Sequence, residues 1–411
     1  MHVQSAIREM KKAIFPFGLT AILLFIGAPF LIAATQGSSQ PIRRNTFRPA
    51  ASYPTGGSGA WFIRPADLGS DGILDLLIVN KESTSITTLA GSSDGTFQPA
   101  TQRPTIPDPR RVVVANLNQD AAPDLVVIGY FANGFSVALS NGGGGYHSDV
   151  FYGLEGHGKM LAVGDVNNDG RQDVIATSDG SGQPISVSIF LGDGDGDLKL
   201  AGYRRTAFYS ARDIEVVDID GDAKLDVLLS TTDPAGQLLI FKGLGDGSVD
   251  APAALPTLAK PPALNDGSDK LVCADVNGDD RPDLVVAHNE EEFEAVSIRL
   301  SREDGTFAPA LILPTPFPTD VAVGDLDHDG RPDLAAANYS TGTLTLFLNR
   351  GGNQWQLAET IPVGAQPRSL ALADYNRDGW ADLAVVNGGE NRVSILLNQA
   401  RMRRPFPTRI P

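Results

Sequence analysis

A nine-residue acidic motif that recurs seven times constrains the fold of this 411-residue chain more than any other feature. The copies start at residues 67, 116, 165, 218, 275, 325 and 374, so neighbouring copies lie 49 to 57 residues apart. In six of the seven copies, oxygen-bearing side chains occupy positions 1, 3, 5 and 9. A near-constant period of this length is typical of repeat proteins, in which each repeat forms one supersecondary unit.

The segments around each motif are short, alternating and β-branched, which is typical of strands. In the sixth repeat the expected strands are 320–324, 334–338 and 343–348. A Gly/Asp turn follows the third strand, as at 91–97, and a Pro-bounded fourth strand follows the turn. Four strands per repeat match one blade of a β-propeller. We therefore expect an all-β fold over residues 46–400, a seven-bladed β-propeller of four-stranded antiparallel blades.

The two ends of the repeat region predict how the propeller closes. Residues 46–54 resemble the fourth-strand segment 96–104, whereas the last repeat stops after its third strand, 393–397. We expect the N-terminal strand to complete the last blade, because this pairing removes exposed sheet edges. The alternative is an open solenoid, which would need capping units at both ends.

The acidic motif itself predicts a calcium site. Three or four carboxylates held close together repel one another, and a hard dication that takes six to eight oxygen ligands relieves this repulsion. Gly at position 6, present in four copies, permits a sharp left-handed turn. The residue at position 7 would add its backbone carbonyl. Magnesium suits the motif less well because it prefers to keep several waters.

We expect up to seven structural Ca²⁺ ions, with the weakest sites in the first two copies, where Gly69 replaces a ligand at position 3 and Ala121 replaces Gly at position 6. Copies three, four, six and seven are expected to bind best. The alternative is a set of solvated turns rich in Asp, Asn and Gly. The predicted ligands are Asp67, Asp71, Asp75, Asn116, Asn118, Asp120, Asp124, Asp165, Asn167, Asp169, Arg171, Asp173, Asp218, Asp220, Asp222, Lys224, Asp226, Asp275, Asn277, Asp279, Arg281, Asp283, Asp325, Asp327, Asp329, Arg331, Asp333, Asp374, Asn376, Asp378, Trp380 and Asp382.

These motifs and their strand frame resemble the FG-GAP/VCBS repeat family, which forms the seven-bladed propeller of integrin α-subunits and occurs in many exported bacterial proteins. The resemblance covers about residues 45–400. It implies that each acidic loop joins the first two strands of a blade and that its calcium is structural. The sequence lacks the leg-like domains of integrins, so their adhesion partners are not expected here.

The first 34 residues have the order of a secretory signal. Arg8, Lys11 and Lys12 precede the uncharged stretch 13–34, and a polar linker follows at 35–45. The uncharged stretch is also long enough to be a membrane anchor. In either case the positive charges place the rest of the chain outside the cytoplasm. We expect a secreted, periplasmic or cell-surface protein that touches a membrane only through an uncleaved N-terminal segment, and a basic tail at 401–411.

Composition excludes several function classes. The net charge of −16 argues against nucleic-acid binding, and the single cysteine excludes a disulfide framework and multi-cysteine metal sites. No nucleophile elbow, phosphate loop or zinc signature is present. His147 and His157 bracket a Gly-rich stretch, but no motif places a nucleophile or base beside them. We therefore predict no catalytic and no cofactor-binding residues other than the calcium ligands.

The sequence thus predicts a monomeric binding or interaction scaffold whose partner is a protein or a carbohydrate. The opposite face from the calcium loops carries two unusual segments, the acidic 288–294 and the insertion 256–270. The alternative is a carbohydrate-active enzyme, such as a polysaccharide lyase on a calcium propeller. A lyase should show Tyr, His, Arg or Lys side chains converging on one site, and in the sequence these residues are scattered.

Overall fold

The computed structural model describes residues 47–120, 122–180, 183–231, 237–256, 270–290 and 293–399. The predicted signal segment 1–34, the linker 35–45 and the basic tail 401–411 lie outside these residues, as does most of the insertion 256–270. The described residues form 28 strands and no helix. None of them belongs to a helix with the length and apolar character needed to cross a membrane.

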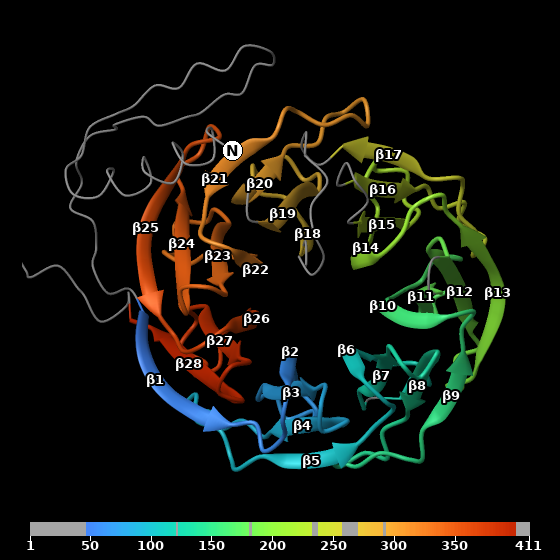
Figure 1. Ribbon diagram of the computed structural model, residues 1–411, viewed down its shortest axis with the longest axis horizontal. Coiled ribbons are helices and arrows are strands. Elements are labelled where there is room, and N and C mark those ends of the chain that lie inside the picture. Colours follow the sequence, from blue (N-terminus) through green and yellow to red (C-terminus); the bar gives the residue numbers. More distant parts are fainter. Residues whose placement is uncertain are drawn as a thin grey trace, which may run out of the picture. The chain divides into compact units, whose positions relative to one another are not determined.

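The strands form seven four-stranded antiparallel sheets arranged around a common centre, which confirms the predicted seven-bladed β-propeller (Figure 1). One strand of each blade lies nearest the centre, and the next three follow outward. The inner strands are β2 (Ala60–Ala66), β6 (Pro109–Ala115), β10 (His157–Gly164), β14 (Ala211–Val217), β18 (Leu271–Ala274), β22 (Pro318–Gly324) and β26 (Pro367–Ala373). The second strands are β3 (Asp75–Asn80), β7 (Asp124–Gly129), β11 (Asp173–Asp179), β15 (Asp226–Thr231), β19 (Asp283–Glu290), β23 (Asp333–Asn338) and β27 (Asp382–Asn387).

The two outer positions complete each blade. The third strands are β4 (Ser85–Leu89), β8 (Gly134–Ala138), β12 (Ser186–Gly192), β16 (Gln237–Phe241), β20 (Phe293–Arg299), β24 (Thr343–Asn349) and β28 (Arg392–Asn398). The outermost strands are β5 (Thr101–Pro104), β9 (Val150–Gly153), β13 (Leu198–Arg205), β17 (Ala253–Pro256), β21 (Leu311–Pro314), β25 (Trp355–Pro362) and β1 (Phe47–Pro54).

The N-terminal strand closes the ring, as the sequence predicts. β1 pairs antiparallel with β28, from Phe47 opposite Asn398 to Pro54 opposite Arg392. Phe47 is only 3% exposed and packs in the core between the sixth and seventh blades. Tyr53 packs edge-on against Phe97 of the first blade, with ring centroids 5.6 Å apart. The last blade is therefore assembled from both ends of the repeat region.

Hydrophobic packing between blades provides the core. The described residues contain seven apolar clusters, and each cluster combines side chains from two neighbouring blades. Five second strands, β7, β11, β15, β23 and β27, are buried at every residue because a blade covers each of their faces. This explains why these strands are predominantly apolar rather than alternating.

Buried charged side chains link inner strands near the centre of the ring. Arg111 on β6 forms an ion pair with Asp213 on β14, and the Lys270 ammonium lies 2.7 Å from the same carboxylate. On β22, Asp320 accepts hydrogen bonds from the Ser369 hydroxyl (2.8 Å) and from the backbone N–H of residue 370 (2.9 Å) on β26. Because Arg111, Asp213 and Asp320 are each less than 9% exposed, this pairing satisfies charges that would otherwise be buried alone.

The closing strand yields the first prediction. Phe47→Ala removes a buried aromatic side chain, and truncations of this kind lower the free energy of unfolding by about 3–5 kcal/mol. The matched control, Arg48→Ala, changes an exposed side chain on the same strand and should have little effect. Urea unfolding measures both variants. Equal stability of the two would show that β1 does not seal the ring.

Candidate metal centres

The seven acidic loops join the inner strand of each blade to the second strand, as the resemblance implies. Because each loop follows an inner strand, all seven lie on one face of the propeller. The backbone turns sharply at two positions of each loop. Position 4 has positive φ in every copy, as at Asn168 (57°) and His328 (61°), and position 6 does so in the six copies where it is described, as at Gly330 (83°). The sequence predicted the left-handed turn only for position 6.

The aspartate at position 1 organises the loop in six copies. In the sixth, the two oxygens of Asp325 accept the backbone N–H groups of Asp329 (3.1 Å) and Gly330 (2.9 Å). In the second copy, Asn116 at position 1 donates its amide N–H to the carbonyl of Asp120. In the other six copies the position-1 carboxylate accepts these backbone N–H groups, and the weakness of the second site stays a prediction.

The carboxylate at position 5 interacts with the residue at position 7 of the same loop. In the sixth copy the position-5 side chain, Asp329, accepts the backbone N–H of Arg331 at 3.0 Å, and the guanidinium of Arg331 pairs with its other oxygen. The same arrangement joins Arg171 to Asp169 (2.5 Å) and Lys224 to Asp222 (3.1 Å). The position-7 residue, predicted only as a carbonyl ligand, thus also brings a cation to the site. The sequence analysis did not predict this ion pair.

The aspartate at position 9 holds each blade together. Asp333 is fully buried and accepts the N–H of Leu326 in its own loop (2.9 Å) and the N–H of Asn349 at the end of β24 (2.8 Å). Equivalent pairs of hydrogen bonds occur in all seven blades, from Asp75 with Leu68 and Gly91 to Asp382 with Tyr375 and Asn398. This residue therefore ties the acidic loop to the third strand.

Burial of these position-9 carboxylates raises their pKa. Desolvation is the main cause in all seven blades, and backbone hydrogen bonds oppose it. Repulsion from other loop carboxylates adds to the rise in all seven blades, and in the sixth and seventh the pKa of Asp333 and of Asp382 rises to about 6. A dication bound to these loops would stabilise the ionised form.

Two loops bring three carboxylates close enough to share one ion. Oxygens of Asp218, Asp220 and Asp222 lie within 4.8 Å of one another, as do oxygens of Asp325, Asp327 and Asp333. Hard oxygen donors in this number suit Ca²⁺, so the residues fit the ion that the motif predicts. These are the fourth and sixth copies, two of the four expected to bind best. An ion bound there would be structural, because it would crosslink the loop.

Nearby cations already neutralise part of both clusters. The Lys242 ammonium lies 2.5 Å from Asp220 and 3.5 Å from Asp226, and Arg350 lies 2.9 Å from Asp327. A calcium ion would have to compete with these side chains. In three other loops the position-3 asparagine, Asn118, Asn167 or Asn277, donates its amide N–H to the position-5 carboxylate.

The remaining predicted residues occupy more varied surroundings. Gly69 leaves the first loop without a ligand at position 3, as expected, and Asp75 is half-buried there. Trp380, at position 7 of the last copy, packs against His328 of the sixth with ring centroids 4.5 Å apart. Asp374 accepts the N–H groups of residues 378 (3.1 Å) and 379 (2.8 Å), so the seventh loop has the same pair of position-1 hydrogen bonds as the sixth.

Segments considered outside the motif have other roles. His288 and Asn289, expected in an exposed acidic loop, are buried within β19, and His288 Nε2 lies 2.8 Å from Ser297 Oγ. His147 is exposed in the turn after a third strand, whereas His157 begins an inner strand. His147 lies in the second blade on the face of the acidic loops and His157 in the third blade on the opposite face, so the histidines do not form a pair.

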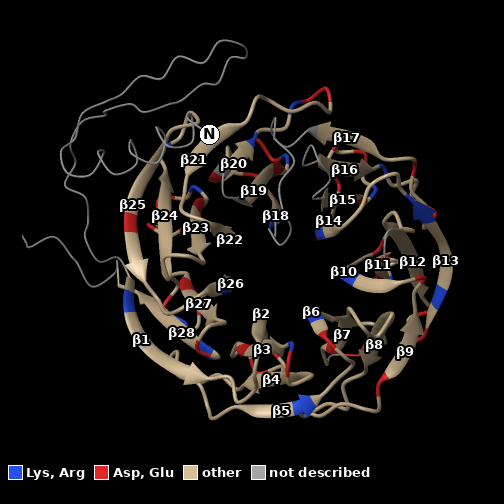
Figure 2. Cartoon of the chain, in the orientation of Figure 1, with Lys and Arg blue, Asp and Glu red and all other residues tan. Residues whose placement is uncertain are grey.

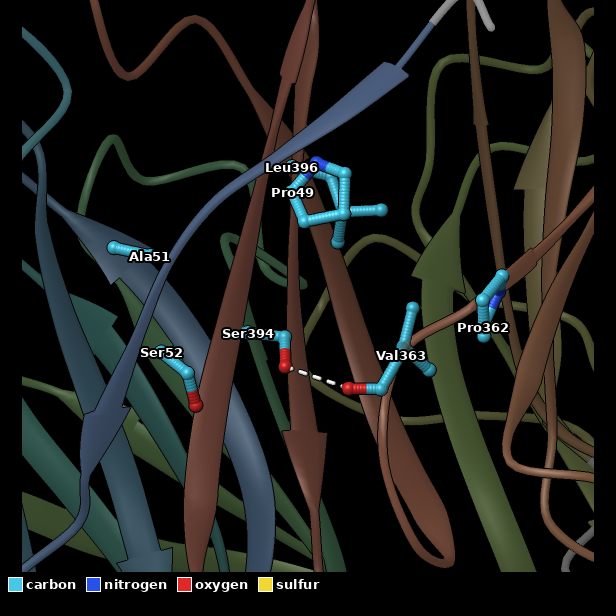
Figure 3. A pocket seen from close by; sticks show the side chains of 7 residues that line it. All are labelled: Pro49, Ala51, Ser52, Pro362, Val363, Ser394 and Leu396. Atoms are coloured by element: carbon cyan, nitrogen blue, oxygen red, sulfur yellow. Dashed lines mark hydrogen bonds between the residues drawn. The ribbon is translucent and has the colours of Figure 1, made fainter.

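One cavity lies at the closure of the ring. A pocket of about 340 Å³ lies where β1 closes the ring, lined by Pro49, Ala51, Ser52, Pro362, Val363, Ser394 and Leu396 (Figure 3). The only polar side chains in that lining are two serines, and Ser394 donates its hydroxyl hydrogen to the Val363 carbonyl at 2.8 Å. The pocket is therefore a packing feature of the closure.

Comparison with known families agrees with the geometry. The FG-GAP-like repeat model matches residues 67–127, 116–176, 165–229, 218–286, 275–336 and 325–385, each match joining two consecutive acidic loops. The chain belongs to the FG-GAP-like repeat family. This family assignment covers most of the propeller and confirms the resemblance seen in the sequence.

Individual relatives of this FG-GAP protein are distant. A T-cell immunomodulatory protein homolog from Plasmodium yoelii yoelii is 27% identical over 132 residues, which cover 30% of this chain but only 19% of that protein. Among solved structures, BBS1N in complex with ARL6DN superimposes with a TM-score of 0.60 at 14% identity, covering 87% of this chain and 98% of that one. An Agrocybe aegerita lectin that recognises non-reducing terminal N-acetylglucosamine gives a TM-score of 0.54 at 17% identity, covering 83% and 86%. Both structures share the fold.

The position-9 aspartate yields the second prediction. Asp333→Ala leaves two buried backbone N–H groups without acceptors, at about 1–3 kcal/mol each, so the free energy of unfolding should fall by about 2–6 kcal/mol. The measurement is made in chelator, so that metal does not contribute. Asp329→Ala, in the same loop but exposed to solvent, is the control and should change stability much less under these conditions. If both variants behave alike, Asp333 does not hold the blade.

Proposed function

We propose that this FG-GAP propeller is exported, is stabilised by Ca²⁺ and serves as an interaction scaffold for a carbohydrate or protein partner. The observation that carries the proposal is the recurrence of one acidic loop in all seven blades, with three-carboxylate clusters in the fourth and sixth. Extracellular calcium modules typically have dissociation constants of about 10⁻⁴–10⁻³ M, which extracellular calcium can occupy. Export, expected from residues 1–34, and calcium binding therefore support each other.

The scaffold role follows from the architecture. Fully paired blades and interblade cores give a rigid frame, and the loops at its two faces are free to differ from blade to blade. The lectin with the same fold supports carbohydrate as one class of partner, and the BBS1N complex supports protein as another. Since a fold can host many functions, the choice between them rests on the surface chemistry of this chain.

Calcium addition tests the first half of the proposal. The protein's stability should increase in calcium and decrease in chelator. At about 10 mM Ca²⁺, dissociation constants of about 10⁻⁴–10⁻³ M correspond to about 1.4–2.7 kcal/mol for each filled site. Thermal unfolding in calcium and in chelator measures the change. Identical melting curves would mean that the loops are metal-free turns.

The sixth loop should contribute to this calcium effect. Asp325→Ala combined with Asp329→Ala removes two of its predicted ligands, so the variant should bind about one ion fewer and gain less stability from calcium than the parent protein. Metal stoichiometry at saturation checks the first outcome and thermal unfolding the second. Because Asp71→Ala changes the loop expected to bind weakly, it serves as the control. An unchanged stoichiometry in the double variant would refute an ion in the sixth loop.

A polysaccharide lyase is the second candidate function. Tyr130 and His157 stack with ring centroids 4.5 Å apart, and the Lys159 ammonium lies 4.6 Å from the Tyr130 ring centroid. The fold thus brings together residue types that are scattered in the sequence. Incubation with acidic polysaccharides, followed by analysis for unsaturated cleavage products, distinguishes an enzyme from a binding scaffold. Product formation that depends on Tyr130 would establish the lyase.

A further inference from the structure

The inner strands share an irregularity at the end away from the acidic loops. In β2, β6, β10, β14, β22 and β26 the register with the second strand shifts within the first few residues. Such bulges bend the strand and redirect a side chain. The residues within the shifts include Trp61, Arg110, Lys159, Arg212, Thr319 and Arg368. Four of these six are cations.

These residues all occupy one place in the repeat, six positions before the first residue of the acidic motif. Turns after the second strands lie beside them, because the start of each inner strand pairs with the end of the second strand, as Ala60 does with Asn80. Figure 2 shows Lys and Arg at the inner ends of β6, β10 and β14. The bulges and these turns therefore form one layer on the face opposite the acidic loops.

Cations and aromatic rings alternate along part of this layer. Arg368 and Arg110 lie 4.3 and 5.4 Å from the Trp61 ring centroid, Lys81 lies 4.9 Å from it, and Arg110 also lies 5.1 Å from the Tyr130 ring centroid. The series extends to Tyr339 through Arg368 (4.9 Å) at one end and to Lys159 through Tyr130 (4.6 Å) at the other. The cation–aromatic belt thus crosses five consecutive blades and consists of Trp61, Lys81, Arg110, Tyr130, Lys159, Tyr339 and Arg368.

The belt brings four cations close together on an acidic protein. Asp108 pairs with Arg110 at 2.9 Å and Asp179 pairs with Lys159 at 3.1 Å, and Arg368 donates a hydrogen bond to the Tyr339 hydroxyl at 3.4 Å. The pKa of Lys81 is lowered, first by burial and then by the charge of Arg110, with Arg368 adding to the effect and Asp108 and Glu82 opposing it. In a chain of net charge −16, such crowding of like charges indicates a place where an anion would bind favourably.

The chemistry of the belt favours a sugar acid. A guanidinium stacked on a ring keeps its in-plane N–H groups, which can donate to a carboxylate in pairs. Phe131, beside Tyr130 at a centroid distance of 5.0 Å, is 66% exposed and offers an apolar surface to a pyranose ring. A repeating polymer of rings and carboxylates matches this alternation over several blades.

We propose that the cation–aromatic belt binds a uronate-containing polysaccharide. The inference rests on the proposed scaffold function and names its partner class and its surface. The uronate carboxylates interact with Arg110, Arg368 and Lys81, and the sugar rings pack near Phe131.

Titration calorimetry in calcium with hyaluronan octasaccharide tests the proposal. Hyaluronan alternates glucuronate with N-acetylglucosamine, so a chito-oligosaccharide of similar length supplies a matched ligand without carboxylates. We expect hyaluronan to bind and the chito-oligosaccharide to bind at least tenfold more weakly. Arg110→Gln with Arg368→Gln should weaken hyaluronan binding at least tenfold. The matched control, Arg48→Gln with Lys199→Gln, removes two exposed cations from the outer strands β1 and β13 and should leave affinity unchanged.

Because Arg110 also pairs with the buried Asp108, the double Arg variant could lose stability as well as affinity. A second, milder variant therefore tests the same site. Phe131→Ala changes an exposed side chain, should keep the parent melting temperature, and should still weaken hyaluronan binding several-fold. Equal affinity in the parent and the belt variants would overturn the proposal. Polyglutamate that binds as tightly as hyaluronan and displaces it would identify an acidic peptide as the occupant instead.

Failure of this inference and failure of the scaffold function give different results. If hyaluronan does not bind but a glycan or protein screen of the calcium-loaded protein finds another partner, the belt proposal is overturned and the scaffold function stands. If the same screen finds no partner of any class, both are refuted.

Discussion

Each blade depends on one buried carboxylate. The aspartate at position 9 accepts a backbone N–H from its own loop and another from the end of the third strand, and so fixes the loop against the blade. The first and second loops show how general this requirement is. They lack a side-chain ligand at position 3 or a carboxylate at position 1, yet both keep the position-9 residue, Asp75 and Asp124, with both of its hydrogen bonds. In these loops the aspartate serves the fold even where the metal motif is incomplete.

The period of the acidic motif was sufficient to predict the architecture. Seven copies at 49–57 residues imply seven blades, and the fourth-strand sequence at 46–54 implies closure through the N-terminus. The loop interactions were predicted only in part. The motif predicted which positions carry oxygen-bearing side chains, but it did not predict the ion pair between Arg331 and Asp329. No sequence pattern indicates that a position-7 side chain will turn back toward position 5.

The belt was missed for a different reason. Trp61, Arg110, Lys159 and Arg368 share a repeat position but differ in chemical type, so no motif unites them. The sequence nevertheless contains a signal, because each of these residues lies six positions before the first residue of an acidic motif. The contacts between these cations and aromatic rings depend on bulges and turns in neighbouring blades. Only the folded structure shows these contacts. The cations of the belt consequently lie on the face opposite the acidic loops.

The pairing of β1 with β28 also has a consequence for synthesis. Phe47 and Asn398 face each other in the sheet but lie 351 residues apart in the chain. At synthesis rates of about 5–20 residues per second, the first strand waits on the order of 20 to 70 s for its partner. During that time its backbone N–H and C=O groups are unpaired and Phe47 is exposed to water. The newly made chain therefore has a vulnerable interval, in which a chaperone or an aggregating neighbour competes with its own C-terminus for the same strand.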